Sequence, residues 1–225
     1  MMNNMKALLF WLPSLAGVGI PRLRVGLTIL ASLLISLPAD AQQPPVKADL
    51  AKPVELAMED QFEQKHTLAD HRGKVVILVY GDRKGTDASR ELGEKLHVLF
   101  HPTAAGLTPA KARTASVVAL AGVPAGKPSP EVAVMPVACI GSVPAPVRGI
   151  IRASLKQDAA DVPVWLDFGS AMSDRFGLRE GEPNLAIFDA QGRLRLKVNG
   201  TPDKATYDKL LQVTQNLRAE AAGLK

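Results

Sequence analysis

The stretch GKVVILVYGDRKGTDASRELGEKLHVLF, residues 73–100, decides the fold of this chain. Residues 75–79 within it form an uninterrupted run of β-branched and aliphatic side chains. Such a run is typical of a strand buried on both faces, as in a parallel or mixed sheet covered by helices. We therefore expect residues 75–79 to lie inside a sheet rather than at its edge.

A polar loop and a helix follow this strand. The loop covers residues 81–87, and Leu92, Leu96 and Leu99 then recur at the spacing of one apolar stripe, which predicts a helix over 89–100. The start of such a helix offers unpaired N–H groups and a positive dipole end. Redox proteins place a cysteine thiolate there, but this loop contains no cysteine.

Composition predicts one globular domain and excludes several function classes. The chain has 225 residues, 47% hydrophobic and 22% charged, which is enough for a sizeable core. Without residues 1–41, the 27 basic and 22 acidic residues fall to 24 and 21. This mild charge and an aromatic content of 4% argue against nucleic-acid binding. The one cysteine, Cys139, cannot form an internal disulfide or a structural zinc site by itself, and no cofactor is implied.

The first 41 residues resemble an export signal. Arg22 and Arg24 precede an apolar run at 25–37, and a small-x-small site ends at Ala41. This pattern predicts a secretory signal peptide cleaved after Ala41, and hence a periplasmic protein. The alternative is a membrane anchor that stays uncleaved, although each apolar run is shorter than the ~20 residues of a bilayer span. After cleavage we expect no stable membrane span, a linker at 42–53 and a domain at 54–222.

The remaining elements alternate between strands and helices. A short hairpin or two brief strands are expected within 54–68. An Ala-rich insertion at about 103–130 carries a helix predicted over 109–121. The strand predicted over 131–140 contains Pro136, which favours an edge position or a bulge. The other predicted strands cover 164–168, 185–188 and 194–198, and the other predicted helices cover 146–156, 170–178 and 203–222. This order predicts an α/β fold with a mixed central sheet and helices on both faces.

Two blocks resemble the redoxin branch of the thioredoxin-like superfamily. The first is the strand, loop and helix of residues 73–100. The second is FGLREGEPNLAIFDAQGRL, residues 176–194, which is similar to the family's glycine, x, proline, strand, Asp-x-x-Gly, strand segment. The resemblance covers most of 54–218 and implies a thioredoxin-like three-layer sandwich. It also implies that Pro183 is the family's cis-proline, which lies beside the redox loop and helps to bind extended substrate backbone.

The departures from the family pattern concern the reactive residues. Peroxiredoxins carry Thr-x-x-Cys at the junction of loop and helix, whereas this chain has Thr86 followed three residues later by Ser89. A thioredoxin-type CxxC is also absent from residues 85–89. The resemblance therefore implies the fold without the activity, as in exported members that lack the active-site cysteines. Ser89 would need a general base and an oxyanion hole to act as a nucleophile, so a place in the first helical turn is the simpler interpretation.

Several polar residues remain as candidates. The degenerate active-site loop presents charged and hydroxyl side chains that suit either recognition of a partner or simple solvation; they are Asp82, Arg83, Lys84, Thr86, Asp87 and Ser89. Four histidines, His66, His71, His97 and His101, either share a metal or lie at the surface, and no accompanying motif favours a metal. Arg148, Arg152 and Lys156 form a basic stripe that suits an acidic partner, a lipid headgroup or solvent.

Two functions follow from these residues. The first is a binding module that holds a periplasmic protein or peptide on the Asp82–Asp87 loop and the Pro183 side, without redox chemistry. The second is residual thiol antioxidant or oxidoreductase activity with Cys139 as its only thiol. A buried and inert Cys139 is the alternative to that second function, because the residue falls within a predicted strand.

Overall fold

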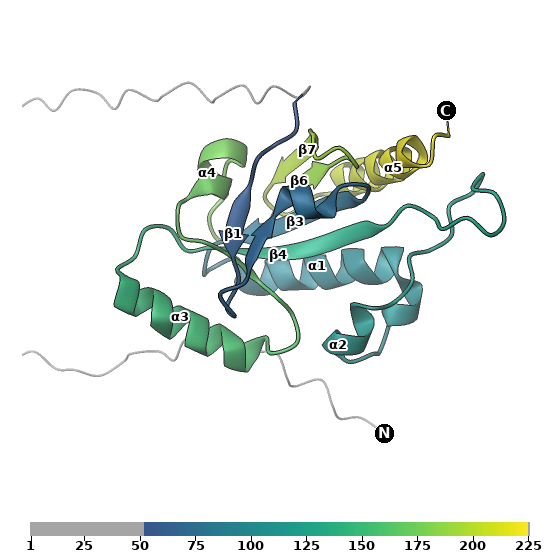
Figure 1. Cartoon of the computed structure of the whole chain (residues 1–225). Helices are drawn as coiled ribbons and strands as arrows, with labels where there is room; N and C mark the ends of the chain where they lie inside the picture. The colour runs from purple at the N-terminus through teal and green to yellow at the C-terminus, as the bar shows by residue number, and fades with distance from the viewer. Residues whose placement is uncertain (1–51, 225) are drawn as a thin grey trace, which may run out of the picture.

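The computed structural model of the chain describes residues 52–224 (Figure 1). The strands are β1 (Ala57–Glu59), β2 (Lys65–Thr67), β3 (Val75–Gly81), β4 (Val132–Cys139), β5 (Trp165–Asp167), β6 (Asn184–Phe188) and β7 (Leu194–Asn199). The α-helices are α1 (Thr86–Phe100), α2 (Pro109–Ala112), α3 (Ala145–Asp158), α4 (Ala171–Phe176) and α5 (Lys204–Ala221). Two short 3₁₀ helices are η1 (Leu68–His71) and η2 (Pro102–Ala104). The expected signal peptide and nearly all of the expected linker lie outside the described residues.

β3 is the central constraint on the sheet. The seven strands lie in the order β2-β1-β5-β4-β3-β6-β7. β3 pairs with β4 in parallel and with β6 in antiparallel orientation, and all seven of its residues are buried. The prediction of a strand buried on both faces is therefore confirmed.

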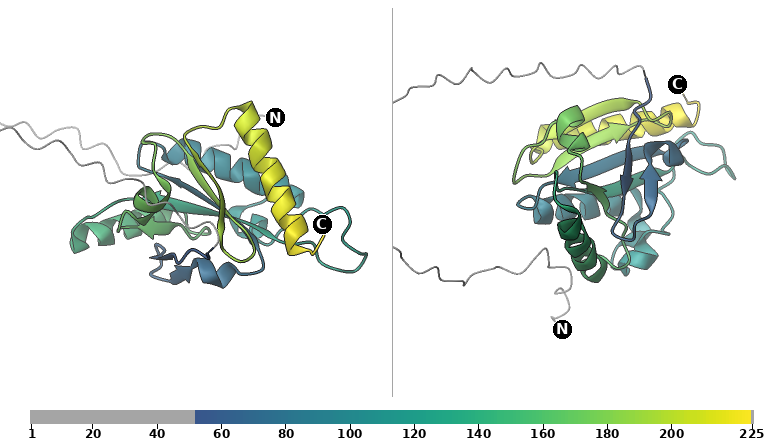
Figure 2. Two further views of the ribbon diagram at one scale, coloured as in Figure 1. Left: turned by 90° about the horizontal axis from the view of Figure 1, so that it is seen from above. Right: turned by 60° about the vertical axis from the view of Figure 1, so that its left-hand side comes forward.

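Helices cover both faces of this mixed sheet. Val75, Ile77 and Val79 face the cluster that α1 and α5 complete, and α3 packs on the same face over β5. Val76, Leu78 and Tyr80 face the opposite cluster, which includes η1 and α4. Figure 2 shows η1 and α1 on opposite sides of the sheet. With β6 antiparallel to β3 and followed by the β7–α5 unit, the fold is the expected thioredoxin-like sandwich.

The helix predicted over 109–121 is wrong beyond its first turn. α2 ends at Ala112, and the chain then runs without regular structure to β4. Residues 113–118 are rich in β-branched and hydroxyl side chains, which favour helices weakly. The backbone there bonds elsewhere instead: Val118 N donates to Phe100 O at 2.7 Å. Contacts with residues distant in the sequence therefore replace the hydrogen bonds of the expected helix.

The edge position or bulge predicted from Pro136 is also wrong. Pro136 lies opposite Val79 in an unbroken parallel ladder, inside the sheet. The ladder from β4 to β5 begins only at Val137. The missing N–H of Pro136 therefore interrupts no pairing on the β5 side, which explains how an interior strand contains proline here.

Each of two predicted apolar stripes has one member that is exposed. On α1, Leu96 and Phe100 are buried, whereas Leu99 is 43% exposed. On α3, Ile151 and Leu155 are buried, whereas Val147 is 38% exposed. In α1 the i, i+4 spacing, rather than i, i+7, selects the buried face because Phe100 reaches the cluster between α1 and α5.

The contrast between Leu96 and Leu99 gives a direct test of the core. We expect Leu96→Ala to lower the free energy of unfolding by about 2–5 kcal/mol, because it empties a fully buried site between α1 and the sheet. Leu99→Ala removes the same atoms from an exposed site and is expected to change it by less than about 1 kcal/mol. Urea denaturation measures both, and equal losses would contradict the stated packing of α1.

Candidate functional site

The loop after β3 is held closed by one carboxylate. Asp82 Oδ1 accepts hydrogen bonds from Gly85 N at 2.8 Å and from Gly181 N at 3.1 Å, and Thr86 Oγ1 donates to Asp82 O at 3.1 Å. The loop is thereby joined to the segment that precedes β6. Of the predicted recognition residues, Asp82 and Thr86 are used inside the protein, whereas the neighbouring Arg83 and Lys84 are exposed.

Ser89 and Asp87 lie in the first turns of α1. Asp87 is exposed and pairs with Arg90 at 3.1 Å. Ser89 is not the N-cap, since the helix is preceded by Gly85 and no side chain caps it. The Ser89 hydroxyl is buried without a hydrogen-bond partner, and a Cβ built on Gly81 would lie 2.5 Å from its Oγ. Among residues 52–224, therefore, no side chain is placed to take a proton from Ser89 Oγ.

Pro183 lies where the resemblance implies, but its peptide bond is trans. No cis peptide bond occurs within residues 52–224, so the prediction of a cis-proline is wrong. The preceding residue packs against the loop: a Cβ on Gly85 would lie 2.8 Å from Glu182 O. Glu182 is held by Asn184 Nδ2, which donates to its carbonyl oxygen at 2.9 Å, and by Thr201 N, which donates to its carboxylate at 2.8 Å. These bonds hold the segment beside the loop, and its peptide bond has the trans form that X–Pro bonds ordinarily prefer.

A polar network missed by sequence reasoning anchors this segment to β3. The Tyr80 hydroxyl donates to Gly177 O at 2.8 Å, and Asn199 Nδ2 donates to Gly177 O at 2.9 Å and to Asn184 Oδ1 at 3.2 Å. Burial raises the pKa of Tyr80, so the hydroxyl stays protonated. The two asparagines stand at opposite positions of the paired β6 and β7, a signal that only the strand register makes visible.

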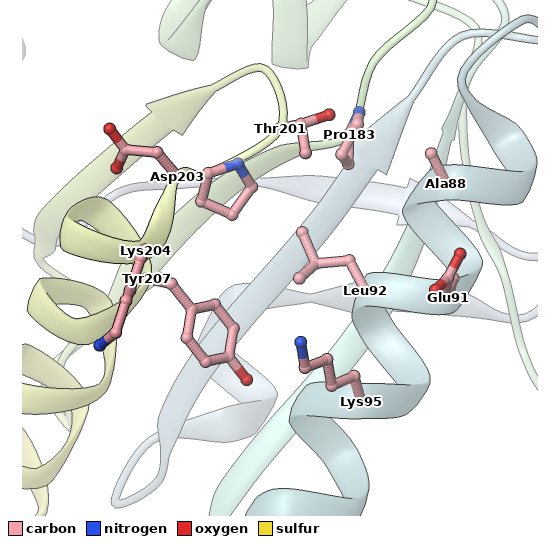
Figure 3. Close-up of a pocket in the computed structure, with 10 residues that line it drawn as sticks. Ala88, Glu91, Leu92, Lys95, Pro183, Thr201, Asp203, Lys204 and Tyr207 are labelled. Atoms are coloured by element: carbon pink, nitrogen blue, oxygen red, sulfur yellow. The ribbon is translucent and has the colours of Figure 1, made fainter.

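A groove opens between the first turns of α1, Pro183 and the start of α5 (Figure 3). We call it the α1–α5 groove; its volume is about 410 Å³. Leu92, Pro183, Pro202 and Tyr207 supply apolar surface, and Glu91, Lys95, Asp203 and Lys204 supply charge. Figure 3 shows Leu92 and Lys95 on α1 facing Tyr207 on α5.

The charged side chains of the α1–α5 groove differ in how they are engaged. Lys95 Nζ lies 4.9 Å from the centroid of the Tyr207 ring. Lys204 pairs with Asp208 at 2.6 Å, and Asp203 caps α5 by accepting from Thr206 N at 2.7 Å. Glu91 is exposed on α1. The groove therefore combines an apolar floor with charges of both signs at its rim.

Cys139 lies on the opposite face of the sheet from Leu92. It lines a smaller cavity of about 230 Å³, the thiol pocket, together with Asp82 and Asp167. Burial, followed by the neighbouring carboxylates of Asp167 and Asp82, raises the pKa of the Cys139 thiol to about 12. Asp167 itself accepts from Met172 N at 2.8 Å and so stays committed to α4. The thiol is half-buried and protonated at neutral pH.

The four histidines are divided between two places. His66 and His71 lie beside Trp165, with ring centroids 5.6 and 6.0 Å from its ring. His97 and His101 stack on each other at 4.4 Å near the C-terminal end of α1. Within residues 52–224 no group of three or more His, Cys, Asp or Glu side chains is arranged to hold a metal ion.

The predicted basic stripe on α3 is largely engaged in the fold. Arg152 Nη2 donates to Glu59 Oε2 at 2.6 Å, and Arg148 Nε donates to Val143 O at 3.1 Å. Both guanidinium groups also lie over the Phe168 ring, at 5.0 and 5.3 Å from its centroid. Lys156 alone of the three is exposed. The stripe thus fastens α3 to β1 and to Phe168, the residue that follows β5.

Comparison with known proteins finds similarity at the level of chain trace. No family model and no curated protein matches the sequence. Similar solved structures include the exposed lipoprotein thioredoxin Etrx1 of Streptococcus pneumoniae, with 17% identity, a TM-score of 0.44, and coverage of 71% of this chain and 99% of that one. A secreted thiol-disulfide isomerase of Corynebacterium glutamicum has 16% identity, a TM-score of 0.43, and coverage of 73% and 84%.

A DsbF homologue of Corynebacterium diphtheriae is similar to the same extent, with 14% identity, a TM-score of 0.42, and coverage of 72% and 85%. These neighbours are thioredoxin-like thiol–disulfide proteins. The thioredoxin-like fold of this chain follows from the order and pairing of its strands.

The close approach of Ser89 to Gly81 predicts a coupled pair of substitutions. Gly81→Ala is expected to lower the free energy of unfolding by about 1–3 kcal/mol, because its Cβ meets Ser89 Oγ. Ser89→Ala is expected to be neutral or stabilising, since the hydroxyl has no partner. The double variant should recover about 1 kcal/mol or more of the loss. Urea denaturation of all four proteins completes the cycle, and additive effects would contradict the contact.

Proposed function

We propose that this chain is an exported thioredoxin-fold protein that binds an extended protein or peptide segment without redox chemistry. The α1–α5 groove carries the proposal: it lies beside the cysteine-free loop and is formed jointly by α1, Pro183 and the start of α5. Its apolar floor suits side chains of the ligand, and its rim charges suit the polar backbone and ends of a peptide. Export to the periplasm is proposed from the N-terminal sequence alone.

The chemistry of the loop supports a role in binding rather than in electron transfer. Disulfide exchange needs a thiolate, and the dipole of a helix N-terminus favours one there. In this chain the N-terminal end of α1 carries Ser89 and lies beside the closed turn around Asp82. A serine hydroxyl cannot be ionised by a helix dipole alone and has no base within hydrogen-bond reach here.

Thiol antioxidant or oxidoreductase activity through Cys139 is the second candidate. One observation favours it: the thiol lines a pocket together with Asp82 of the degenerate loop. Burial, and after it the carboxylates of Asp167 and Asp82, act in the other direction, because they favour the protonated thiol over the thiolate and together raise the pKa of Cys139 to about 12. The binding function is therefore the better supported of the two.

Blocking the groove tests the proposed binding. We expect Ala88→Trp, which places an indole at the groove wall, to weaken binding of reduced and carboxymethylated lactalbumin, an unfolded polypeptide, by tenfold or more. Ala153→Trp is the matched control, since Ala153 is also exposed on a helix but lies on α3 outside the groove. Fluorescence polarisation measures the affinity. Absence of binding to the parent chain, or equal losses in both variants, would overturn the proposal.

Alkylation of Cys139 by iodoacetamide separates the two candidates. With a pKa of about 12, the thiolate fraction at pH 8 is at least about 100-fold below that of a free cysteine. We expect native labelling to be slower than labelling in urea by at least that factor, and to keep rising with pH beyond pH 9, where the denatured protein levels off. Native labelling as fast as denatured labelling would favour thiol chemistry.

A further inference from the structure

The insertion between α1 and β4 is a strap across the ends of two helices. The strap, residues 109–131, passes over the C-terminal end of α1 and beside α5. Val118 N donates to Phe100 O at 2.7 Å, and Val117 packs against the cluster between α1 and α5. The buried Arg218 of α5 donates to Val118 O at 2.5 Å and to Pro130 O at 3.0 Å. The strap is thus held from α1 and from α5.

His101 lies beneath this strap. Its ring is 3% exposed. Its Nδ1 lies 3.1 Å from His97 O and its Nε2 lies 2.5 Å from Glu131 Oε1. Each ring nitrogen of His101 thus faces an oxygen acceptor, one a carbonyl and one a carboxylate. His101 thereby connects the end of α1 to Glu131, where the strap joins β4.

His97 stacks on this cation and bonds the strap itself. The two rings are 4.4 Å apart at an interplanar angle of 19°, and His97 Nε2 donates to Ala112 O at 3.0 Å. Burial is the main cause that lowers the pKa of His97, and the charge of His101 adds to it. The bond to Ala112 O and the charge of Glu131 oppose this lowering without cancelling it.

Groups of both signs surround the His97 ring. From its own helix it faces His101, and from the strap it faces Glu131. Arg218 on α5 faces Glu131 in turn. Lys111 on α2 precedes the bonded Ala112 and is exposed. Glu131, whose side chain is 40% exposed, is thus the carboxylate that faces both histidines and Arg218.

We propose that the stacked His97–His101 pair is an acid-responsive latch that releases the strap from α1 when His97 becomes charged. Two charged rings with centroids 4.4 Å apart would repel each other, and opening relieves that repulsion by hydrating both rings. In the open state His97 regains the usual pKa near 6.5, whereas in the closed state its pKa is lower. Protons therefore bind the open state preferentially, and the closed state loses stability as pH falls below about 6.5. Opening uncovers Phe100, which is 1% exposed in the closed state.

Amide hydrogen exchange on the full chain at pH 7.5 and 5.5 tests the latch. After correction for intrinsic exchange rates, protection of peptides from 113–131 is expected to fall by up to about tenfold at pH 5.5, because an open-state imidazole is about ten-to-one protonated there. Peptides from β3 and β6 should not change. A uniform change across the chain, or none in the strap, would overturn the proposal.

Two variants separate His97 from the other titrating groups. His97→Gln keeps an amide donor for Ala112 O and removes the titration, so the strap should keep its protection at pH 7.5 and lose its pH dependence. His66→Gln removes an imidazole that pairs with Asp60 elsewhere, and it should leave the pH dependence intact. Retained pH dependence in His97→Gln would overturn the latch.

An NMR titration of the parent chain keeps the test decisive if His97→Gln does not fold. The ring of His97 is expected to titrate below pH 6.5, together with shifts of the Val117 and Val118 amides. A midpoint at or above 6.5, or strap amides that do not follow the ring, would equally overturn the proposal.

Discussion

The burial of β3 on both faces is the constraint on which the rest of the structure depends. Its side chains alternate between two clusters, one completed by α1 and α5 and the other by η1 and α4. The same strand pairs with β4 on one edge and β6 on the other. The end of β3 therefore brings three segments together: the loop around Asp82, the Pro183 segment that leads into β6, and Cys139 at the end of β4.

The positions of these segments explain how the chain can have a thioredoxin-like fold in which a thiolate is disfavoured. Asp82 ties the loop to Gly181, and Glu182 packs on Gly85, so the corner is rigid and shaped by backbone. The positive end of α1 points there, but the side chain it offers is a serine without a base. The one thiol lies across the sheet among carboxylates, where its charged form is disfavoured. What remains accessible beside the corner is the α1–α5 groove.

The elements predicted best were those whose local pattern agrees with their tertiary surroundings. Residues 75–79 and the two strands around the turn at 189–192 are examples. Their local sequence patterns were enough to predict that they form strands. The strap differs, because Arg218 bonds Val118 from 100 residues away and no local pattern encodes that contact. The prediction of an edge or a bulge at Pro136 failed for a similar reason. Pro136 fits inside the sheet because the β4–β5 ladder begins only at Val137, and the sequence of β4 does not show this.

The candidate site was predicted in part. The loop residues and Pro183 do lie side by side, but the roles of Asp82 and Glu182 depend on backbone groups of other segments. The α1–α5 groove could not be predicted, because it depends on how α1 and α5 are placed relative to each other. The sequence of either helix does not show that placement. Cys139 was identified as a strand residue, but its carboxylate neighbours come from two different strand ends.

The central claim is that the N-terminal end of α1, beside Pro183, supports no disulfide or peroxide reduction because it carries no cysteine. Steady-state reduction of insulin disulfides and of hydrogen peroxide by the purified chain, supplied with excess dithiothreitol, tests this most directly. The account predicts rates equal to those of dithiothreitol alone, both for the parent chain and for Cys139→Ser. Turnover by the parent chain that disappears in Cys139→Ser would contradict it.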